Sequence, residues 1–249
     1  MYIKILSIII LTAFTNIILS QNCSKVIKIN NNIGLCLLKD SVFTISNYYE
    51  MEHFGRVESN GLLIVKNAKA ILVDTPCDNE QTSQLYSYLK DSMHITITKV
   101  IVCHYHIDCL GGLGFIQQQG IESISLDLTK EKCIEKKLPI PSVTFSEKLI
   151  LNFEGADVIC QYFGSGHTVD NIIVYLPKNN ILFGGCLIKS LSSKNLGNTA
   201  DAVIDKWPIT VKNLQAQYKK AEIVIPGHGD IGNSDLLQHT LELLNANEK

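Results

Sequence analysis

The sequence predicts an α/β protein in which two β-sheets pack face to face and helices cover them on the outside. Apolar, β-branched runs typical of strands alternate with helical patterns along the 249 residues. The alternation divides into two similar halves, and such an order is typical of packed sheets covered by helices. A hydrophobic content of 46% provides enough apolar surface for one large core.

The first half begins with strands and continues into alternating helices and strands. Five strands are expected first, over residues 26–29, 34–38, 42–47, 61–66 and 70–74. A helix over residues 80–92 should follow, because Asp78 or Asn79 provides an N-cap side chain. The remaining elements of this half are a strand over 99–103, a helix over 110–119, a strand over 123–126 and a helix over 129–136.

The second half repeats the pattern. Strands are expected over residues 143–151, 158–163, 171–176, 181–185 and 221–227, with helices over 208–219 and 234–245. The sequence has no low-complexity stretch or proline-rich linker, so residues 21–249 are expected to form a single domain. The formal net charge of −2 and the lack of a basic run argue against a nucleic-acid-binding surface.

Residues 1–20 have the pattern of a secretory signal peptide. A positively charged start and an apolar run are followed by a cleavage site before Gln21. The run is too short and too interrupted by polar residues to span a membrane, so we expect export without stable membrane insertion. A lipid anchor at Cys23 is a less favoured alternative, because Gln21 and Asn22 are not the small residues that precede a lipidation site.

Eight cysteines in an exported chain raise the question of disulfides. The sequence does not determine their pairing. Cys23 and Cys36 flank a turn-like run of asparagines and could approach each other. Cys103 and Cys160 stand in apolar strand patterns, so both are expected in the core.

Side chains that bind metals occur at four predicted strand ends. The segments are His104-Tyr105-His106-Ile107-Asp108, Gly166-His167, Gly185-Cys186 and Gly227-His228-Gly229. Imidazole, thiolate and carboxylate groups are zinc ligands, and open α/β folds bind ligands at strand ends. A lone histidine or cysteine at such a place is more often a packed or surface residue. Four of the seven histidines fall in these segments, however, and this conjunction favours a metal centre.

In this order, the four segments resemble those of the metallo-β-lactamases, and specifically subclass B1. The resemblance extends from about residue 26 to residue 244. It implies a four-layer αββα sandwich, the metallo-β-lactamase fold, and two Zn²⁺ ions as cofactors. By the family pattern, the ligands of the first zinc are His104, His106 and His167, and those of the second are Asp108, Cys186 and His228.

Two further residues match positions that bind substrate in this family. Lys189 follows Cys186 by three positions and resembles the lysine that pairs with the substrate carboxylate. Asn198 resembles the asparagine that holds the substrate carbonyl, and with Asp108 it is expected to take part in catalysis. The implied activity is hydrolysis of the β-lactam amide of penicillins, cephalosporins and carbapenems by a zinc-bound hydroxide, which confers antibiotic resistance. A monomer in the periplasm is expected.

Two positions favour the subclass. Related thioesterases of the superfamily and subclass B3 enzymes usually place a histidine directly after the aspartate, where this chain has Cys109. The thioesterases use a bridging aspartate where this chain has Cys186, and B3 enzymes usually lack that cysteine. Cys109 itself could support a ligand, bind metal as an alternative soft ligand, or be a site of oxidation.

Residues 48–57 correspond to the hairpin that covers the site in this family, with Phe54 at its tip. Family members often carry a tryptophan flanked by glycines there, whereas this chain has His53 before Phe54 and Gly55 after it. Two other functions stay open: a hydrolase of the same fold acting on a thioester or lactone, and a zinc protein without catalysis. The second predicts closed four-ligand sites, whereas three histidines leave one position open.

Overall fold

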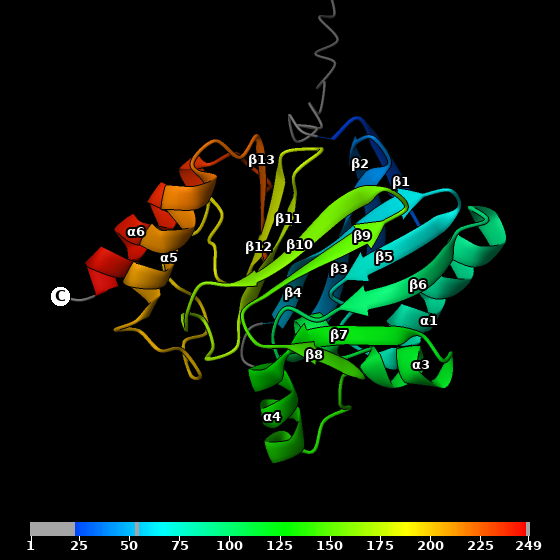
Figure 1. Cartoon of the computed structure of the whole chain (residues 1–249), viewed down its shortest axis with the longest axis horizontal. Helices are drawn as coiled ribbons and strands as arrows, with labels where there is room; N and C mark the ends of the chain where they lie inside the picture. Colours follow the sequence, from blue (N-terminus) through cyan, green and yellow to red (C-terminus); the bar gives the residue numbers. More distant parts are fainter. Residues whose placement is uncertain (1–22, 53–54, 248–249) are drawn as a thin grey trace, which may run out of the picture.

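The computed structural model describes residues 23–52 and 55–247. Two β-sheets of eight and five strands face each other, and helices lie on their outer sides (Figure 1). Helices α5 (Trp207–Tyr218) and α6 (Asp235–Asn247) flank the smaller sheet, and α1 (Asn79–Ser87) and α3 (Leu113–Gln118) flank the larger one. The predicted four-layer αββα sandwich is confirmed. The predicted signal peptide, residues 1–20, lies outside the described residues.

The larger sheet follows chain order from β1 to β8. Its strands are β1 (Lys25–Lys28), β2 (Ile33–Lys39), β3 (Val42–Met51), β4 (Gly55–Lys66), β5 (Lys69–Val73), β6 (Thr96–Ile101), β7 (Glu122–Leu126) and β8 (Val143–Phe145). Strands β1 to β5 pair antiparallel, whereas β5 to β8 pair parallel. Because β5 and β6 are parallel, Asp74 and the 104–108 segment that follow them lie at the same edge of the sheet.

The smaller sheet has the order β13-β12-β11-β10-β9. Its strands are β9 (Lys148–Phe153), β10 (Ala156–Tyr162), β11 (Ile172–Leu176), β12 (Ile181–Gly185) and β13 (Ile223–Pro226). Strands β12 and β13 are parallel, so the residues after them, Cys186 and His228, leave the sheet side by side. The N–H of Gly227 donates to the carbonyl oxygen of Gly185 at 2.7 Å, which joins the two strand ends.

The expected strand over residues 143–151 is wrong in one respect. The segment forms two strands in different sheets, β8 in the larger sheet and β9 in the smaller one. The chain therefore crosses from one sheet to the other at residues 146–147. Alternating side chains predict extended backbone but do not indicate which sheet a strand joins. Strands β3 and β4 are also longer than predicted, because they pair up to Met51 and Gly55.

The helices begin and end close to the predicted residues, with two differences. The predicted helix over 80–92 consists of α1, capped by the Asp78 carboxylate on the N–H of Gln81 at 2.7 Å, and a π-helical turn at Tyr88–Ser92. The predicted helix over 110–119 is shorter and is formed by α3 alone, and an additional short helix, α2 (Ile107–Leu110), precedes it. Helix α4 (Asp127–Lys136) covers the expected 129–136. In residues 23–52 and 55–247, no helix is long and apolar enough to cross a membrane.

Two features of the cysteines follow from the packing. Cys103 and Cys160 are buried in the core, as predicted. Cys23 and Cys36 form a disulfide, with their Cα atoms 5.6 Å apart. The paired strands β1 and β2 bring these two residues together, a pairing that the sequence left open. A sulfur atom in a disulfide cannot also carry a lipid, which argues against lipidation of Cys23.

Candidate metal centre

The loop after β6 and the short helix α2 carry the first three candidate ligands. His104 follows the strand, His106 occupies the N-cap position of α2, and Asp108 lies in its first turn. Asp108 therefore lies on a helix, whereas His104 lies in the loop that precedes it. Gly111 ends α2 where a Cβ atom would overlap the Cys77 carbonyl, so glycine permits the close packing that positions this turn.

Cys186 and His228 meet because glycine stands beside them. Gly185 has a positive φ of 53°, which turns the chain at the end of β12. A Cβ atom at Gly227 would overlap Cys186, so only glycine allows the two chain segments to approach this closely. The glycines seen in the sequence thus determine how near the two side chains lie.

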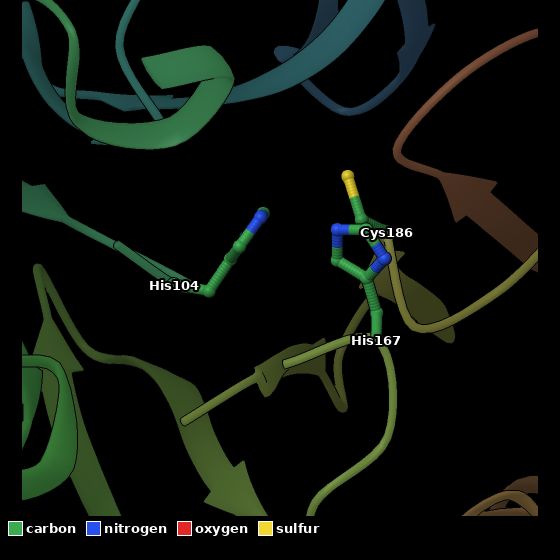
Figure 2. A group of neighbouring side chains, drawn as sticks. All are labelled: His104, His167 and Cys186. Carbon is green, nitrogen blue, oxygen red and sulfur yellow. The ribbon is translucent and has the colours of Figure 1, made fainter. Parts of the chain in front are cut away.

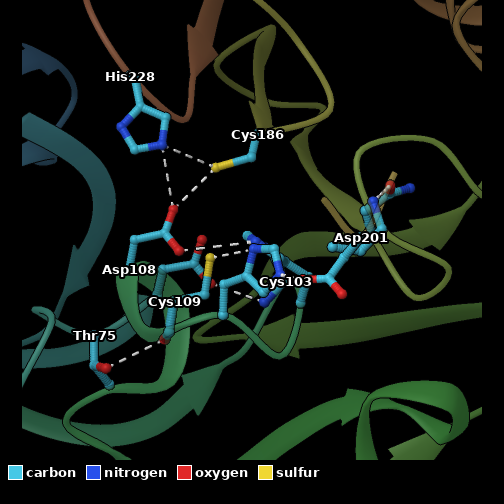
Figure 3. Close-up of polar contacts among 12 residues, drawn as sticks. Thr75, Cys103, Asp108, Cys109, Cys186, Asp201 and His228 are labelled. Atoms are coloured by element: carbon cyan, nitrogen blue, oxygen red, sulfur yellow. Dashed lines mark hydrogen bonds and ion pairs between the residues drawn. The ribbon is translucent and has the colours of Figure 1, made fainter. Parts of the chain in front are cut away.

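Asp108, Cys186 and His228 form a close triangle of donor atoms (Figure 3). Oδ2 of Asp108 is 3.0 Å from Sγ of Cys186 and 3.4 Å from Nε2 of His228. Sγ of Cys186 is 3.4 Å from the same histidine nitrogen. Nδ1 of His228 donates to the carbonyl oxygen of Glu58 at 2.6 Å, which directs Nε2 toward the triangle.

The other three histidines cluster beside this triangle. The ring centroids of His104 and His106 are 4.7 Å apart, and His167 lies 5.0 Å from the first and 5.2 Å from the second. His104 and His167 point toward each other and toward Cys186 from separate segments (Figure 2). Within the described residues, Nε2 of His104 and Nδ1 of His167 are buried without a hydrogen-bond partner.

The candidate ligand atoms fall into overlapping groups. Each group has its donor atoms within 4.8 Å of one another, and the groups are His104–His106–Asp108, His104–His167–Cys186 and Asp108–Cys186–His228. All six predicted ligands are therefore brought together, with His104, Asp108 and Cys186 shared between groups. Unpaired buried polar atoms are costly, and a bound metal would satisfy them. The donor set fits zinc.

The pKa shifts favour, for most of these side chains, the protonation state that can bind a metal ion. Burial lowers the pKa of His104 to about 3 and that of His167 well below its usual value, so both imidazoles are neutral. Although burial alone would raise it, contacts with His228 and His104 hold the pKa of Asp108 well below its usual range. Hydrogen bonding with Cys109 is the main cause that lowers the pKa of Cys186 to about 7.

His228 behaves differently. Burial lowers its pKa, but the adjacent Cys186 and Asp108 outweigh burial and raise the pKa well above its usual value. The negative charges of Cys186 and Asp108 thus favour a positive charge between them, and in this structure a proton on His228 supplies it. A divalent cation among the three side chains would supply that charge instead.

Two residues that support the ligands were missed by sequence reasoning. Asp201, from a segment far along the chain, accepts a hydrogen bond from Nε2 of His106 at 2.9 Å. Asp74 accepts the N–H of Cys103 at 2.8 Å, directly before His104. Asp74 could have been found from the sequence, because it follows an apolar strand, β5, that lies beside β6, the strand before His104. Asp201 could not have been found in this way, because no local sequence pattern links it to His106.

The site opens into a cavity of about 610 Å³ whose walls include both predicted substrate-binding residues. Lys189 is 8% exposed, and its Nζ lies 5.3 Å from the centre of the Trp207 ring. Asn198 is exposed at the rim, where its Oδ1 accepts the N–H of Ala200 at 3.1 Å and leaves the amide nitrogen as a donor.

The predicted hairpin contributes the apolar wall of the same cavity. Tyr49, Met51 and Val57 line it from β3 and β4. His53 and Phe54, the predicted tip, lie outside the described residues.

Comparisons with known proteins agree with this geometry. The family model described as "Metallo-beta-lactamase superfamily" matches residues 54–228. A Bacteroides fragilis protein named "Metallo-beta-lactamase type 2" is 40% identical over 221 residues, with 89% of each chain covered. A Bacillus cereus protein of the same name is 34% identical over 243 residues, covering 96% of this chain and 95% of the relative.

Solved structures give the same result. The DIM-1 metallo-β-lactamase exposed to ceftazidime superposes with a TM-score of 0.83 at 34% identity, over 87% of this chain and 98% of the other. A metallo-β-lactamase from Pontibacter korlensis gives a TM-score of 0.83 at 37% identity, over 86% and 99%. On its sequence, its fold and its ligand cluster, the chain belongs to the metallo-β-lactamase superfamily, and these relatives confirm the resemblance to subclass B1.

Proposed function

We propose that this protein is a zinc-dependent β-lactamase that hydrolyses the amide bond of penicillins, cephalosporins and carbapenems and so confers resistance to them. The observation that carries the proposal is the Asp108–Cys186–His228 triangle beside three clustered histidines at one end of a substrate-sized cavity. The relatives named metallo-β-lactamase support it.

The two neighbouring donor clusters support two zinc ions. His104, His106 and His167 would hold the first. The low pKa values of His104 and His167 make protons weak competitors for these two side chains. Asp108, Cys186 and His228 would hold the second, because a thiolate and a carboxylate offset its charge. Bound zinc supplies water activation near neutral pH, where the pKa of a coordinated water falls to about 7, and a Lewis acid for the carbonyl.

The remaining groups of the site bind and orient the substrate. The ammonium of Lys189 faces the cavity as a point charge and would pair with the substrate carboxylate. The amide nitrogen of Asn198 would donate to the carbonyl oxygen as negative charge develops there. Asp108 lines the cavity and, as a ligand of the second zinc, would take part in catalysis.

Export to the periplasm completes the proposal. The Cys23–Cys36 disulfide supports an oxidising compartment, where such bonds persist. Cleavage after residue 20 would leave residues 21–249 as a single-domain monomer. A β-lactam would be destroyed there before it reaches the enzymes that build the cell wall.

Steady-state kinetics with titrated zinc test this function. Purified mature protein should open the lactam ring of a penicillin, a cephalosporin and a carbapenem, followed as loss of ring absorbance. Chelation should abolish turnover and zinc should restore it. Activity that survives strong chelators would exclude metal catalysis, and turnover of S-lactoylglutathione without any lactam would favour a thioesterase instead.

A further inference from the structure

Two lysines, Lys136 and Lys189, line the cavity beside the metal centre. Lys189 lies near Asp108 and Cys186, whose charges act on its pKa against the lowering effect of burial. Lys136 lines the same cavity, as do Tyr105 and Asp201. Asp201 accepts the hydrogen bond from Nε2 of His106 at 2.9 Å, so Lys136 shares the cavity wall with a residue that supports this candidate ligand.

The backbone holds Lys136 at the edge of this cavity. It is the last residue of α4, and the next residue, Lys137, ends the helix in a left-handed conformation with φ of 57°. Leu138 then returns to the cavity wall. A positive charge is favoured at a helix C-terminus, so the ammonium is stabilised where it stands.

The ammonium of Lys136 makes only a weak ion pair within the described residues. Its Nζ lies 3.9 Å from Oε1 of Glu135, whereas the other oxygen of Glu135 accepts Lys132 at 2.7 Å. Its side chain is 47% exposed. The nearby carboxylate of Asp201 is engaged by His106 at 2.9 Å. The Lys136 ammonium can therefore reach an anion in the cavity without breaking a strong ion pair.

The chemistry of a β-lactam decides which part of the substrate meets this lysine. The ring carboxylate is attached next to the lactam nitrogen, while the acylamino side chain is attached to the carbon on the other side of the carbonyl. With the carboxylate on Lys189 and the carbonyl at Asn198, the acylamino side chain would extend away from Lys189. Lys136 is the other lysine of the cavity wall and would be the cation that meets this side chain.

We propose that Lys136 is a specificity-determining residue that favours β-lactams carrying a second anionic group on the acylamino side chain. This inference rests on the proposed function. An exposed ion pair of this kind changes kcat/KM by about 1.4- to 5-fold, because such pairs are modest and solvent-screened. Its contribution should decrease as ionic strength rises.

Two penicillins that differ by one carboxylate isolate the effect. Benzylpenicillin has a neutral side chain, and carbenicillin has the same side chain with an added α-carboxylate. The ratio of their kcat/KM values is measured for the wild type, Lys136→Gln and Lys136→Glu. Lys130→Glu is the matched control, because Lys130 is an exposed lysine on the same helix outside the cavity and gives the same change in net charge.

The expected result is a lower carbenicillin-to-benzylpenicillin ratio, by about 1.4- to 5-fold for Lys136→Gln and by more for Lys136→Glu. The effect should shrink in high salt, and Lys130→Glu should keep the wild-type ratio. An unchanged ratio in Lys136→Glu, or an equal change in Lys130→Glu, overturns the proposal while benzylpenicillin turnover still supports the β-lactamase function. A wild type that hydrolyses neither penicillin overturns both.

Discussion

The thiol of Cys109 lies 3.0 Å from Nδ1 of His104 and leaves Nε2 of that histidine facing Asp108, whose Oδ1 is 3.8 Å away. Cys109 is buried and belongs to none of the donor groups found in the described residues. The geometry therefore favours the supporting role for Cys109 over the alternative of a soft ligand. A contact of this kind orients the imidazole and selects the ring nitrogen that is free to bind metal.

Substitution of Cys186 and of Cys109 should distinguish a zinc ligand from a residue that only orients a ligand. Cys186→Ser removes the thiolate next to Asp108, so zinc at the second site should weaken by more than about 100-fold. Cys109→Ser keeps a hydroxyl beside His104, so this variant should lose no more than about tenfold in zinc affinity. Competition titration with a chromophoric chelator measures both affinities. Equal losses would mean that Cys109 is itself a ligand.

Zinc uptake at the second site should depend on pH through Cys186. The pKa of this thiol is lowered to about 7, so above pH 7 it is largely thiolate and below pH 7 a proton competes with the metal. Apparent affinity should therefore fall by up to about tenfold for each pH unit below 7 from this group alone. Zinc titrations from pH 5.5 to 8 measure the slope. If the zinc affinity of Cys186→Ser depended on pH as steeply as that of the wild type, the competing proton would belong to another group.

Asp201 should act on the metal centre without touching the metal. Asp201→Ala removes the acceptor of the His106 Nε2–H, and zinc affinity at the histidine cluster should fall by about 10- to 100-fold. Asp201→Asn keeps an acceptor oxygen, so its loss should be smaller. Asp205→Ala is the control, because Asp205 is 76% exposed and pairs only loosely with Lys206 at 3.8 Å. If Asp201→Ala binds zinc like the control, the contact has no positioning role.

Gly111 should be essential for the packing beneath Asp108. In Gly111→Ala the new methyl group would overlap the Cys77 carbonyl, so the free energy of unfolding should fall by about 1–3 kcal/mol or more. Gly34→Ala is the control, because its nearest contact would be 3.7 Å from the Ile27 carbonyl oxygen. Urea denaturation of the metal-free proteins compares the two. Equal stability in both variants would contradict the close packing at Gly111.

The sequence predicted much of the local structure because the relevant signals are local. Asp78 was proposed as a helix cap, and it caps α1. The six candidate ligands follow apolar strands, three of them (His167, Cys186 and His228) directly after a glycine, and the structure brings all six together. Periodicity could not assign residues 143–151 to two sheets, nor show that a separate short helix, α2, precedes Gly111. Those outcomes depend on neighbours that a local pattern does not contain.

By itself, then, the sequence determined the identity of the candidate ligands, the family and the alternation of strands and helices. Only the tertiary structure decided what holds the ligands: Asp201 on His106, Cys109 on His104 and the Glu58 carbonyl on His228. The physical reason is that hydrogen bonds between His106 and Asp201, or His228 and Glu58, join segments brought together only when the sheets pack. The same packing buried Lys189 against Trp207 and placed the half-exposed Lys136 on the wall of the same cavity.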